Sequence, residues 1–81
     1  MRIDKFLTVS RIIKRRTVAN EACDAGRISV NGRQAKASYD LKVGDVVTVG
    51  FGQRSLTFRV LDVKEHVTKD GAGELYEVLS Q

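Results

Sequence analysis

Apolar residues near the N-terminus recur with the spacing of a helix. They stand at positions i, i+3 and i+4 and so share one face of a short helix that begins near Arg2, the residues being Ile3, Phe6 and Leu7. We expect this face to pack into the core, with Arg2 and Lys5 lying off it. In the connection at residues 10–16, at least one member of the pair Ile12-Ile13 should point inward, because exposing both would leave apolar surface in water.

A second helix of about two turns is predicted between Thr17 and Gly26. Thr17 can accept a hydrogen bond from the free amides of the next turn and is the predicted N-cap, whereas Gly26 suits the left-handed conformation that ends a helix. The apolar positions between them are small: Val18, Ala19, Ala22, Cys23 and Ala25. This face permits a close approach to the first helix, with Cys23 as a core residue rather than a nucleophile.

After the second predicted helix, apolar and polar residues alternate. Residues 28–30 alternate as in a half-buried strand, and Asn31-Gly32 predicts a hairpin turn, because both central residues of that turn need positive φ. The return strand is expected at residues 33–36. In the loop that follows, Tyr39 is a candidate core residue.

Further turns and strands are predicted along the second half of the chain. They are a turn at Val43-Gly44-Asp45, a strand at 46–49, a bulge or turn at Gly50-Phe51-Gly52, a strand at 56–60, another near Val63, a loose tip at 69–73 and a last strand at 75–79. The fold class is therefore α+β, with two short N-terminal helices packed on a small, mostly antiparallel sheet or partial barrel of about five strands. We expect one domain over residues 1–81, with a motif core at about 1–50 and C-terminal strands at 51–81.

Charge is distributed unevenly over this pattern. The net charge is +4, but residues 1–36 carry nine Lys or Arg and three acids, a balance of +6, whereas residues 37–81 carry five and seven, a balance of −2. Such asymmetry in a small domain indicates a face that binds a polyanion, with nucleic acid favoured over an anionic membrane. The alternative is a basic surface that is merely solvated.

The basic residues gather around the predicted second helix. Free amides and the positive dipole end at a helix N-terminus attract phosphate, and guanidinium groups bind phosphate oxygens in pairs. Basic positions after the helix and on the hairpin would extend this site if the hairpin folds back beside the helices. The candidate RNA-binding residues are Arg2, Lys5, Arg11, Lys14, Arg15, Arg16, Arg27, Asn31, Arg33 and Lys36.

The type of nucleic acid follows from what the basic region lacks. Of the five aromatic residues only Phe6 lies there, and its spacing makes it core, so base stacking is not expected to be the main mode. A DNA-reading helix would carry base-reading side chains, but the second helix offers mainly small residues and two acids, Glu21 and Asp24. The remaining interpretation is that the protein recognises folded RNA by its shape and its phosphates.

Catalytic and metal chemistry find little support in the sequence. Cys23 and His66 are each the only residue of their kind, so a disulfide within the chain and a thiolate zinc cluster are excluded, and no acid–base set suggests an enzyme. We expect no metal and no cofactor, and Asp62, Glu65 and His66 are interpreted as solvated. No signal peptide or membrane span is evident, so a cytoplasmic protein is predicted.

Four spaced stretches resemble the RNA-binding domain first described in ribosomal protein S-four, the alpha-L RNA-binding motif. These are residues 2–7, Arg16-Thr17 opening a helix, residues 26–32 and residues 44–49. The resemblance covers roughly residues 1–50 and implies a helix pair on a small sheet that binds structured ribosomal or transfer RNA. The motif also occurs appended to RNA-modifying enzymes and tRNA synthetases, but this chain has no room for a catalytic domain.

Within that family, residues 10–17 and 34–38 are similar to small bacterial factors of ribosome quality control, and a heat-shock factor of the large subunit is a more distant match. The resemblance implies a factor that contacts ribosomal RNA and the P-site tRNA on large subunits carrying an obstructed nascent chain. It also implies a protein partner that adds an untemplated C-terminal tail. We expect the protein to be a monomer. A constitutive structural protein of the ribosome is the remaining alternative.

Overall fold

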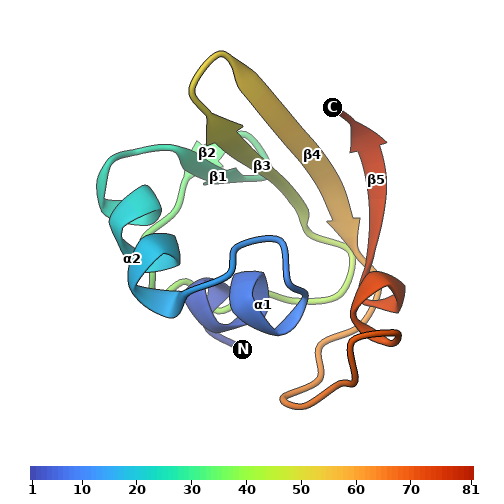
Figure 1. Ribbon diagram of the computed structural model, residues 1–81. Helices are drawn as coiled ribbons and strands as arrows, with labels where there is room; N and C mark the ends of the chain where they lie inside the picture. Colours follow the sequence, from blue (N-terminus) through green and yellow to red (C-terminus); the bar gives the residue numbers. More distant parts are fainter.

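The computed structural model describes residues 1–81 and places two helices against a five-stranded antiparallel sheet with strand order β2-β1-β3-β4-β5 (Figure 1). The helices are α1 (Ile3–Val9) and α2 (Arg16–Asp24). The strands are β1 (Ile28–Val30), β2 (Arg33–Gln34), β3 (Val46–Phe51), β4 (Arg54–Val60) and β5 (Tyr76–Ser80), and a short 3-10 helix, η1 (Ala72–Glu74), precedes β5. The predicted α+β class is confirmed.

The core lies between α1 and the sheet. The predicted apolar face of α1 is fully buried, and Phe6 stacks on Phe58 of β4 with ring centroids 6.0 Å apart. Alternate positions of the two central strands supply the other side of the core: Val47, Val49, Phe58 and Val60. Ile13 is buried as well, which confirms that the connection between the helices turns an isoleucine inward.

The second helix begins two residues earlier than predicted, at Arg16 rather than Val18, so the assignment of Thr17 as N-cap is wrong. Arg15 is the last extended residue, at φ −122° and ψ 139°, and no side chain caps the helix. The first residue of the helix, Arg16, is bonded to Asp4 of α1, so a tertiary contact rather than a capping side chain lies at the start of α2. The small buried face is confirmed, because Ala19 and Cys23 lie in the core and α2 packs on α1.

The hairpin after α2 forms with the positive φ angles that the sequence predicted. Gly26 has φ +75°, and the turn residues Asn31 and Gly32 have φ +52° and +84°. The return strand is shorter than predicted, because Ala35 turns into the core and leaves β2 with two residues.

Tyr39 is not a core residue. Its side chain is 38% exposed, while its carbonyl oxygen accepts a hydrogen bond from the Ile3 amide. Leu41 fills the core two residues later, with 1% exposure. An aliphatic side chain suits this position because it has no hydroxyl that would need a buried partner.

The second half differs from the predictions at three places. The turn at residues 43–45 forms, but β3 runs on to Phe51 and the reversal centres on Gly52, which has φ +64°. No strand forms near Val63, since residues 61–70 make an irregular connection whose valines pack partly on the core. The tip expected to be loose contains η1, whose Ala72 is buried.

Candidate nucleic-acid interface

A buried carboxylate organises the basic surface near the N-terminus. Asp4, 1% exposed, accepts hydrogen bonds from Arg2 Nε and Nη2, each at 3.2 Å, from Arg16 Nη2 at 3.4 Å and from Asn20 Nδ2 at 3.3 Å. Arg16 Nε lies 3.4 Å from the second carboxylate oxygen. We call these four residues the Asp4 cluster. It joins the start of α1 to the first two turns of α2.

The electrostatics of the cluster favour an ionised Asp4. Burial by itself raises the pKa of this carboxyl, but the hydrogen bonds from Arg2, Arg16 and Asn20 and the charge of Arg16 outweigh it and lower the pKa below the ordinary value of 3.8. Two guanidinium groups share one carboxylate, so the cluster retains a net positive charge.

The contact with Asp4 holds the two arginines of the cluster in place but leaves their side chains half exposed. The side chains of Arg2 and Arg16 remain 50% and 51% exposed. Their unused N–H groups border a shallow depression of about 420 Å³ that also includes Thr17 and Glu21. Because each guanidinium is held by the Asp4 carboxylate through its Nε and Nη2 edge, its remaining donors lose little freedom when they bind a phosphate.

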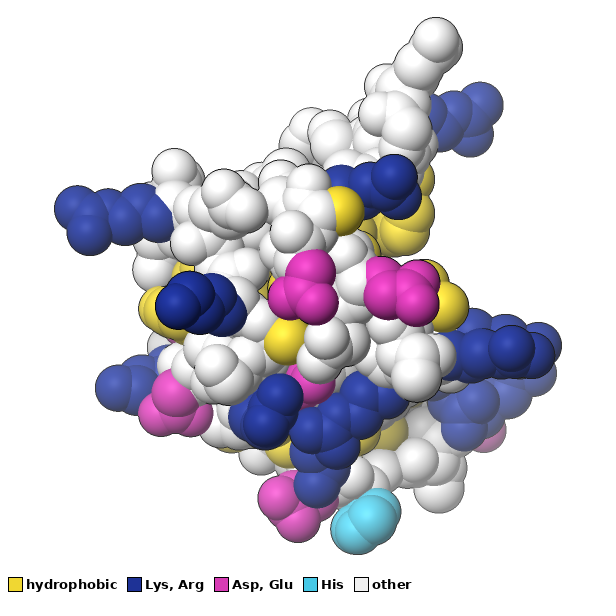
Figure 2. Space-filling view, turned by 90° about the vertical axis from the view of Figure 1, so that its left-hand side faces the viewer, with side chains coloured by type: hydrophobic (Ala, Val, Ile, Leu, Met, Phe, Trp, Pro, Cys, Tyr) yellow, Lys and Arg dark blue, Asp and Glu magenta, His cyan; other side chains and the backbone are white.

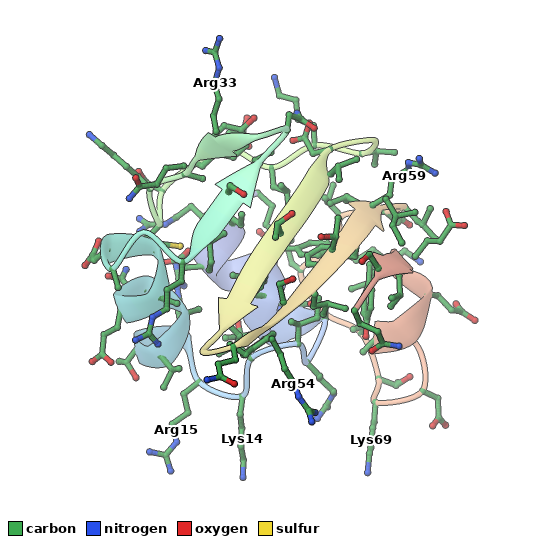
Figure 3. All side chains as sticks on the ribbon, turned by 90° about the horizontal axis from the view of Figure 1, so that it is seen from above. Lys14, Arg15, Arg33, Arg54, Arg59 and Lys69 are labelled. Carbon is green, nitrogen blue, oxygen red and sulfur yellow. The ribbon has the colours of Figure 1, made fainter.

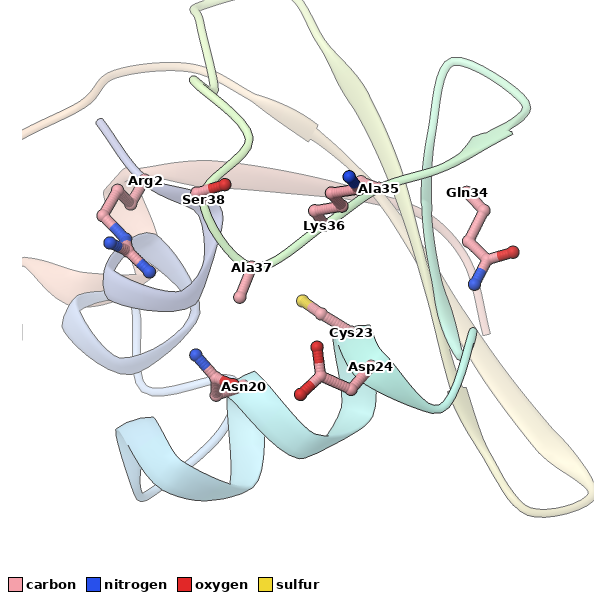
Figure 4. A pocket seen from close by; sticks show the side chains of 9 residues that line it. All are labelled: Arg2, Asn20, Cys23, Asp24, Gln34, Ala35, Lys36, Ala37 and Ser38. Carbon is pink, nitrogen blue, oxygen red and sulfur yellow. The ribbon is translucent and has the colours of Figure 1, made fainter.

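A second depression adjoins the first and brings in the segment after β2. It measures about 680 Å³ and has Arg2, Lys36 and Ser38 on one side and Asn20, Cys23 and Asp24 of α2 on the other (Figure 4). Arg2 and Asn20 border both depressions. The structure thus brings together three of the predicted residues, Arg2, Arg16 and Lys36, into one surface.

Other predicted residues point elsewhere. Lys14 and Arg15 extend from the connection between the helices toward one side of the molecule, and Arg33 extends from β2 toward the opposite side (Figure 3). Arg27 is exposed just after α2, and Arg11 lies in the connection between the helices near the hairpin of β3 and β4.

Two further candidates, Lys5 and Asn31, also have partners within the fold. Lys5 Nζ lies 3.2 Å from a carboxylate oxygen of Glu65. Asn31 donates from its side chain to Asp45 at 3.1 Å and accepts from the Val46 amide at 3.0 Å, which ties the first hairpin to β3. Both polar atoms of the Asn31 amide are therefore engaged within the fold.

The exposed surface of α2 itself is partly acidic. Figure 2 shows Asp and Glu side chains in the middle of the α2 side of the molecule, with Lys and Arg side chains around them. The acids of α2 are Glu21 and Asp24, both exposed. A polyanion would therefore contact the margins of this face, where the Asp4 cluster and Lys36 lie.

Asp4 and Asn20 were missed as site residues. In the sequence Asp4 is only one of the acids that reduce the net positive charge of the N-terminal region. Its partners Arg16 and Asn20 come 12 and 16 residues later. The local spacing Arg2-x-Asp4 is a weak signal, since it does not show that the carboxylate is buried.

Cys23 has the properties of a core thiol. It is 2% exposed, and burial, followed by the negative charges of Asp4 and Asp24, raises its pKa to about 11. A thiol with this pKa is almost wholly protonated at neutral pH and is a poor nucleophile.

No cluster of three or more His, Cys, Asp or Glu side chains is arranged to hold a metal ion. The helices are all too short to cross a membrane.

Residues 1–47 match the S4 domain, a span that holds both helices, the first hairpin and the whole Asp4 cluster. The chain belongs to the S4 domain family. This confirms the family that the four spaced stretches indicated.

Individual proteins that are similar to this chain are more informative than the family alone. The chain is 54% identical to the RQC P-site tRNA stabilizing factor of Bacillus subtilis strain 168 over 81 residues, 100% of this chain and 94% of that protein. It is also 54% identical over 81 residues to the protein of the same name from Streptococcus pneumoniae strain R6, covering 92% of it. The trimeric structure of Vibrio cholerae Heat Shock Protein 15 superposes with a TM-score of 0.90 at 26% identity, over 99% of this chain and 82% of that one.

Proposed function

We propose that this protein is a non-enzymatic, cytoplasmic RNA-binding factor that acts on the large ribosomal subunit. It contacts ribosomal RNA and the P-site tRNA when a nascent chain is obstructed, and it supports C-terminal tailing by a partner protein. The Asp4 cluster carries the proposal: two half-exposed arginines held by one buried carboxylate, in a chain 54% identical along its whole length to a P-site tRNA stabilizing factor.

The arrangement suits RNA phosphates better than a small substrate. Its depressions are shallow and bordered by guanidinium, ammonium and amide groups, which donate to phosphate oxygens, with the carboxylates of Glu21 and Asp24 on the α2 side. Contacts of this type do not depend on base identity and position a protein on a folded RNA by its shape. Binding through six to ten phosphates would fall by about a thousandfold or more between 50 and 200 mM salt.

Co-sedimentation with large subunits tests the proposal. At low salt the protein should migrate with subunits that carry a P-site peptidyl-tRNA and should leave them as the salt rises. Arg16→Ala should weaken this association, whereas Arg59→Ala, which changes a half-exposed arginine of β4 that is paired with Glu77 of β5, should not. A protein that stays at the top of the gradient at low salt would contradict the proposal.

The second candidate function is a large-subunit recycling factor of the heat-shock type, favoured by the superposition on Heat Shock Protein 15. The two candidates differ in the tailing step. A reconstituted tailing reaction on obstructed subunits should slow when this protein is omitted if the first candidate is correct. Retention on all subunits after a salt wash would instead indicate a constitutive ribosomal protein.

A further inference from the structure

A second basic surface lies away from the Asp4 cluster, between the connection of the two helices and the hairpin of β3 and β4. It is a groove of about 850 Å³, here called the hairpin groove, formed by Arg11, Ile12, Phe51, Arg54, Ser55, Leu56, Tyr76 and Gln81. Its size falls within the range of about 300 to 1,000 Å³ that is typical of ligand sites. Arg54 points toward the same side of the molecule as Lys14 and Arg15 (Figure 3).

The floor of the groove is apolar because the helices do not cover the end of the sheet. Val47, Val49 and Phe51 alternate on the face of β3 that faces the core; the two valines are buried but Phe51 is 47% exposed. Tyr76 is only partly buried, and its ring meets Phe58 edge to face at 5.4 Å. The apolar stripe of the core thus continues into solvent at the hairpin.

The walls of the groove carry positive charge, and no acidic side chain lies among them. Arg11 and Arg54 are exposed, neither forms an ion pair, and no Asp or Glu borders the groove. The register pairs Phe51 with Arg54, so these two side chains project from the same face of the sheet, with Cβ atoms about 5 Å apart. An arginine therefore emerges directly beside an exposed phenyl ring.

An exposed aromatic ring in one groove with unpaired arginines is a combination that binds single-stranded nucleic acid. A base stacks on the ring, and the guanidinium groups hold the neighbouring phosphates. Arg11 and Phe51 stand 40 positions apart in the sequence, and only the fold brings them to one groove. The expectation that stacking plays little part considered Phe6 alone in the basic region and did not include Phe51.

We propose that the hairpin groove binds an unpaired nucleotide of RNA, with the base on Phe51 and the phosphates held by Arg11 and Arg54. The inference rests on the proposed function only in taking RNA as the partner. It adds a second contact, to a single-stranded segment, to the phosphate contacts of the Asp4 cluster. The two surfaces together would let the protein hold two RNA segments at once.

Binding of a fluorescein-labelled oligouridylate to the full chain tests the groove separately from the ribosome. Phe51→Ala should weaken this binding by about tenfold and leave its salt dependence unchanged, because it removes stacking and no charge. Phe51→Tyr should restore the affinity. Arg54→Ala should weaken binding and reduce the slope of log affinity against log salt by about 0.7, the value for one phosphate of a single strand.

Arg59→Ala is the matched control, since it removes a half-exposed arginine from the same strand. Thermal unfolding of each variant checks the fold, which should survive because the changed side chains are exposed. Equal affinity of wild type, Phe51→Ala and Arg54→Ala for the oligonucleotide would overturn the inference, even if the protein binds large subunits. So would Phe51-dependent binding of a labelled acidic peptide or of anionic vesicles in place of the RNA.

Discussion

The Asp4 cluster and the hairpin groove present arginine side chains to solvent in opposite ways. In the cluster, Arg2 and Arg16 share a buried carboxylate that fixes their geometry and lowers their net charge. In the groove, Arg11 and Arg54 have no partner and border an apolar floor. The cluster is therefore suited to one fixed arrangement of phosphates, and the groove to a flexible strand whose base contributes as much as its phosphate.

Arg16→Ala should have the largest effect on binding to large subunits. A charge-assisted hydrogen bond contributes about 1.5 to 3 kcal/mol, so we expect the affinity to fall by about tenfold to a hundredfold. Arg16→Lys keeps the charge but not the paired contact of Nε and Nη2 with Asp4, and its affinity should lie between those of wild type and Arg16→Ala. Quantitative sedimentation at fixed salt measures the loss, with Arg59→Ala as the control. An equal loss in the lysine and alanine variants would show that geometry alone matters, and no loss would remove the cluster from the interface.

Asp4→Asn should separate positioning from charge. The variant gains positive charge, yet we expect subunit affinity to fall by about fivefold because the arginines are no longer held in place. Stability should fall by about 1 to 2 kcal/mol, since a charged acceptor of several hydrogen bonds is lost. Urea unfolding measures this loss. Stronger RNA binding by Asp4→Asn would mean that net charge, not geometry, decides affinity at the cluster.

The pH dependence of stability provides an independent test of Asp4. Because the pKa of Asp4 in the fold lies below its ordinary value of 3.8, the ionised group stabilises the protein fully above about pH 4. This contribution is lost as the pH falls through the lower pKa of the folded state. The difference in unfolding free energy between wild type and Asp4→Asn should therefore shrink on acidification. A difference that stays constant to pH 2.5 would contradict the ion pairs.

Lys36→Ala should have a smaller effect, because Lys36 is a single exposed ammonium at the edge of the cluster. The affinity for large subunits should fall by about threefold and the salt slope by about 1. Lys64→Ala is the matched control, since it removes a lysine paired with Asp62 in the connection after β4. Identical losses in the two variants would mean that charge acts over the whole surface.

The rate of Cys23 modification reports on how rigid the cluster side of the molecule is. With a pKa of about 11 and 2% exposure, this thiol should react with a disulfide reagent at pH 8 far more slowly than in the unfolded chain. Asp4→Asn should speed the reaction, because it removes a nearby negative charge and loosens the contact between α1 and α2. Fast reaction of the native wild type would contradict the packing of α2.

The sequence predicted the features that depend on neighbouring residues. Helical spacing identified the buried face of α1, and the Asn31-Gly32 pair identified the hairpin, because both signals arise within a few positions. Thr17 and Tyr39 were assigned wrongly because a cap and a core position are also decided by contacts from elsewhere: Arg16 with Asp4, and Leu41 in place of Tyr39.

The sequence identified basic residues of the candidate site but neither Asp4 and Asn20 nor the arrangement of the site. Arg2, Arg16 and Lys36 were identified by charge alone. The role of Asp4 depends on a contact with a residue 12 positions away, and the hairpin groove joins residues that are 40 positions apart in the sequence. Charge counts do not reveal which arginines share a carboxylate and which stand free. That distinction appears only when α1, α2 and the sheet are packed together.

Cross-linking of bound RNA in growing cells, followed by sequencing, tests the interface most directly. The wild-type protein should recover ribosomal RNA of the large subunit together with tRNA, and Arg16→Ala should recover much less of both while Arg59→Ala recovers as much as wild type. Recovery dominated by messenger RNA, or recovery of ribosomal RNA and tRNA that Arg16→Ala leaves unchanged, would contradict a role for the Asp4 cluster in binding RNA on the large subunit.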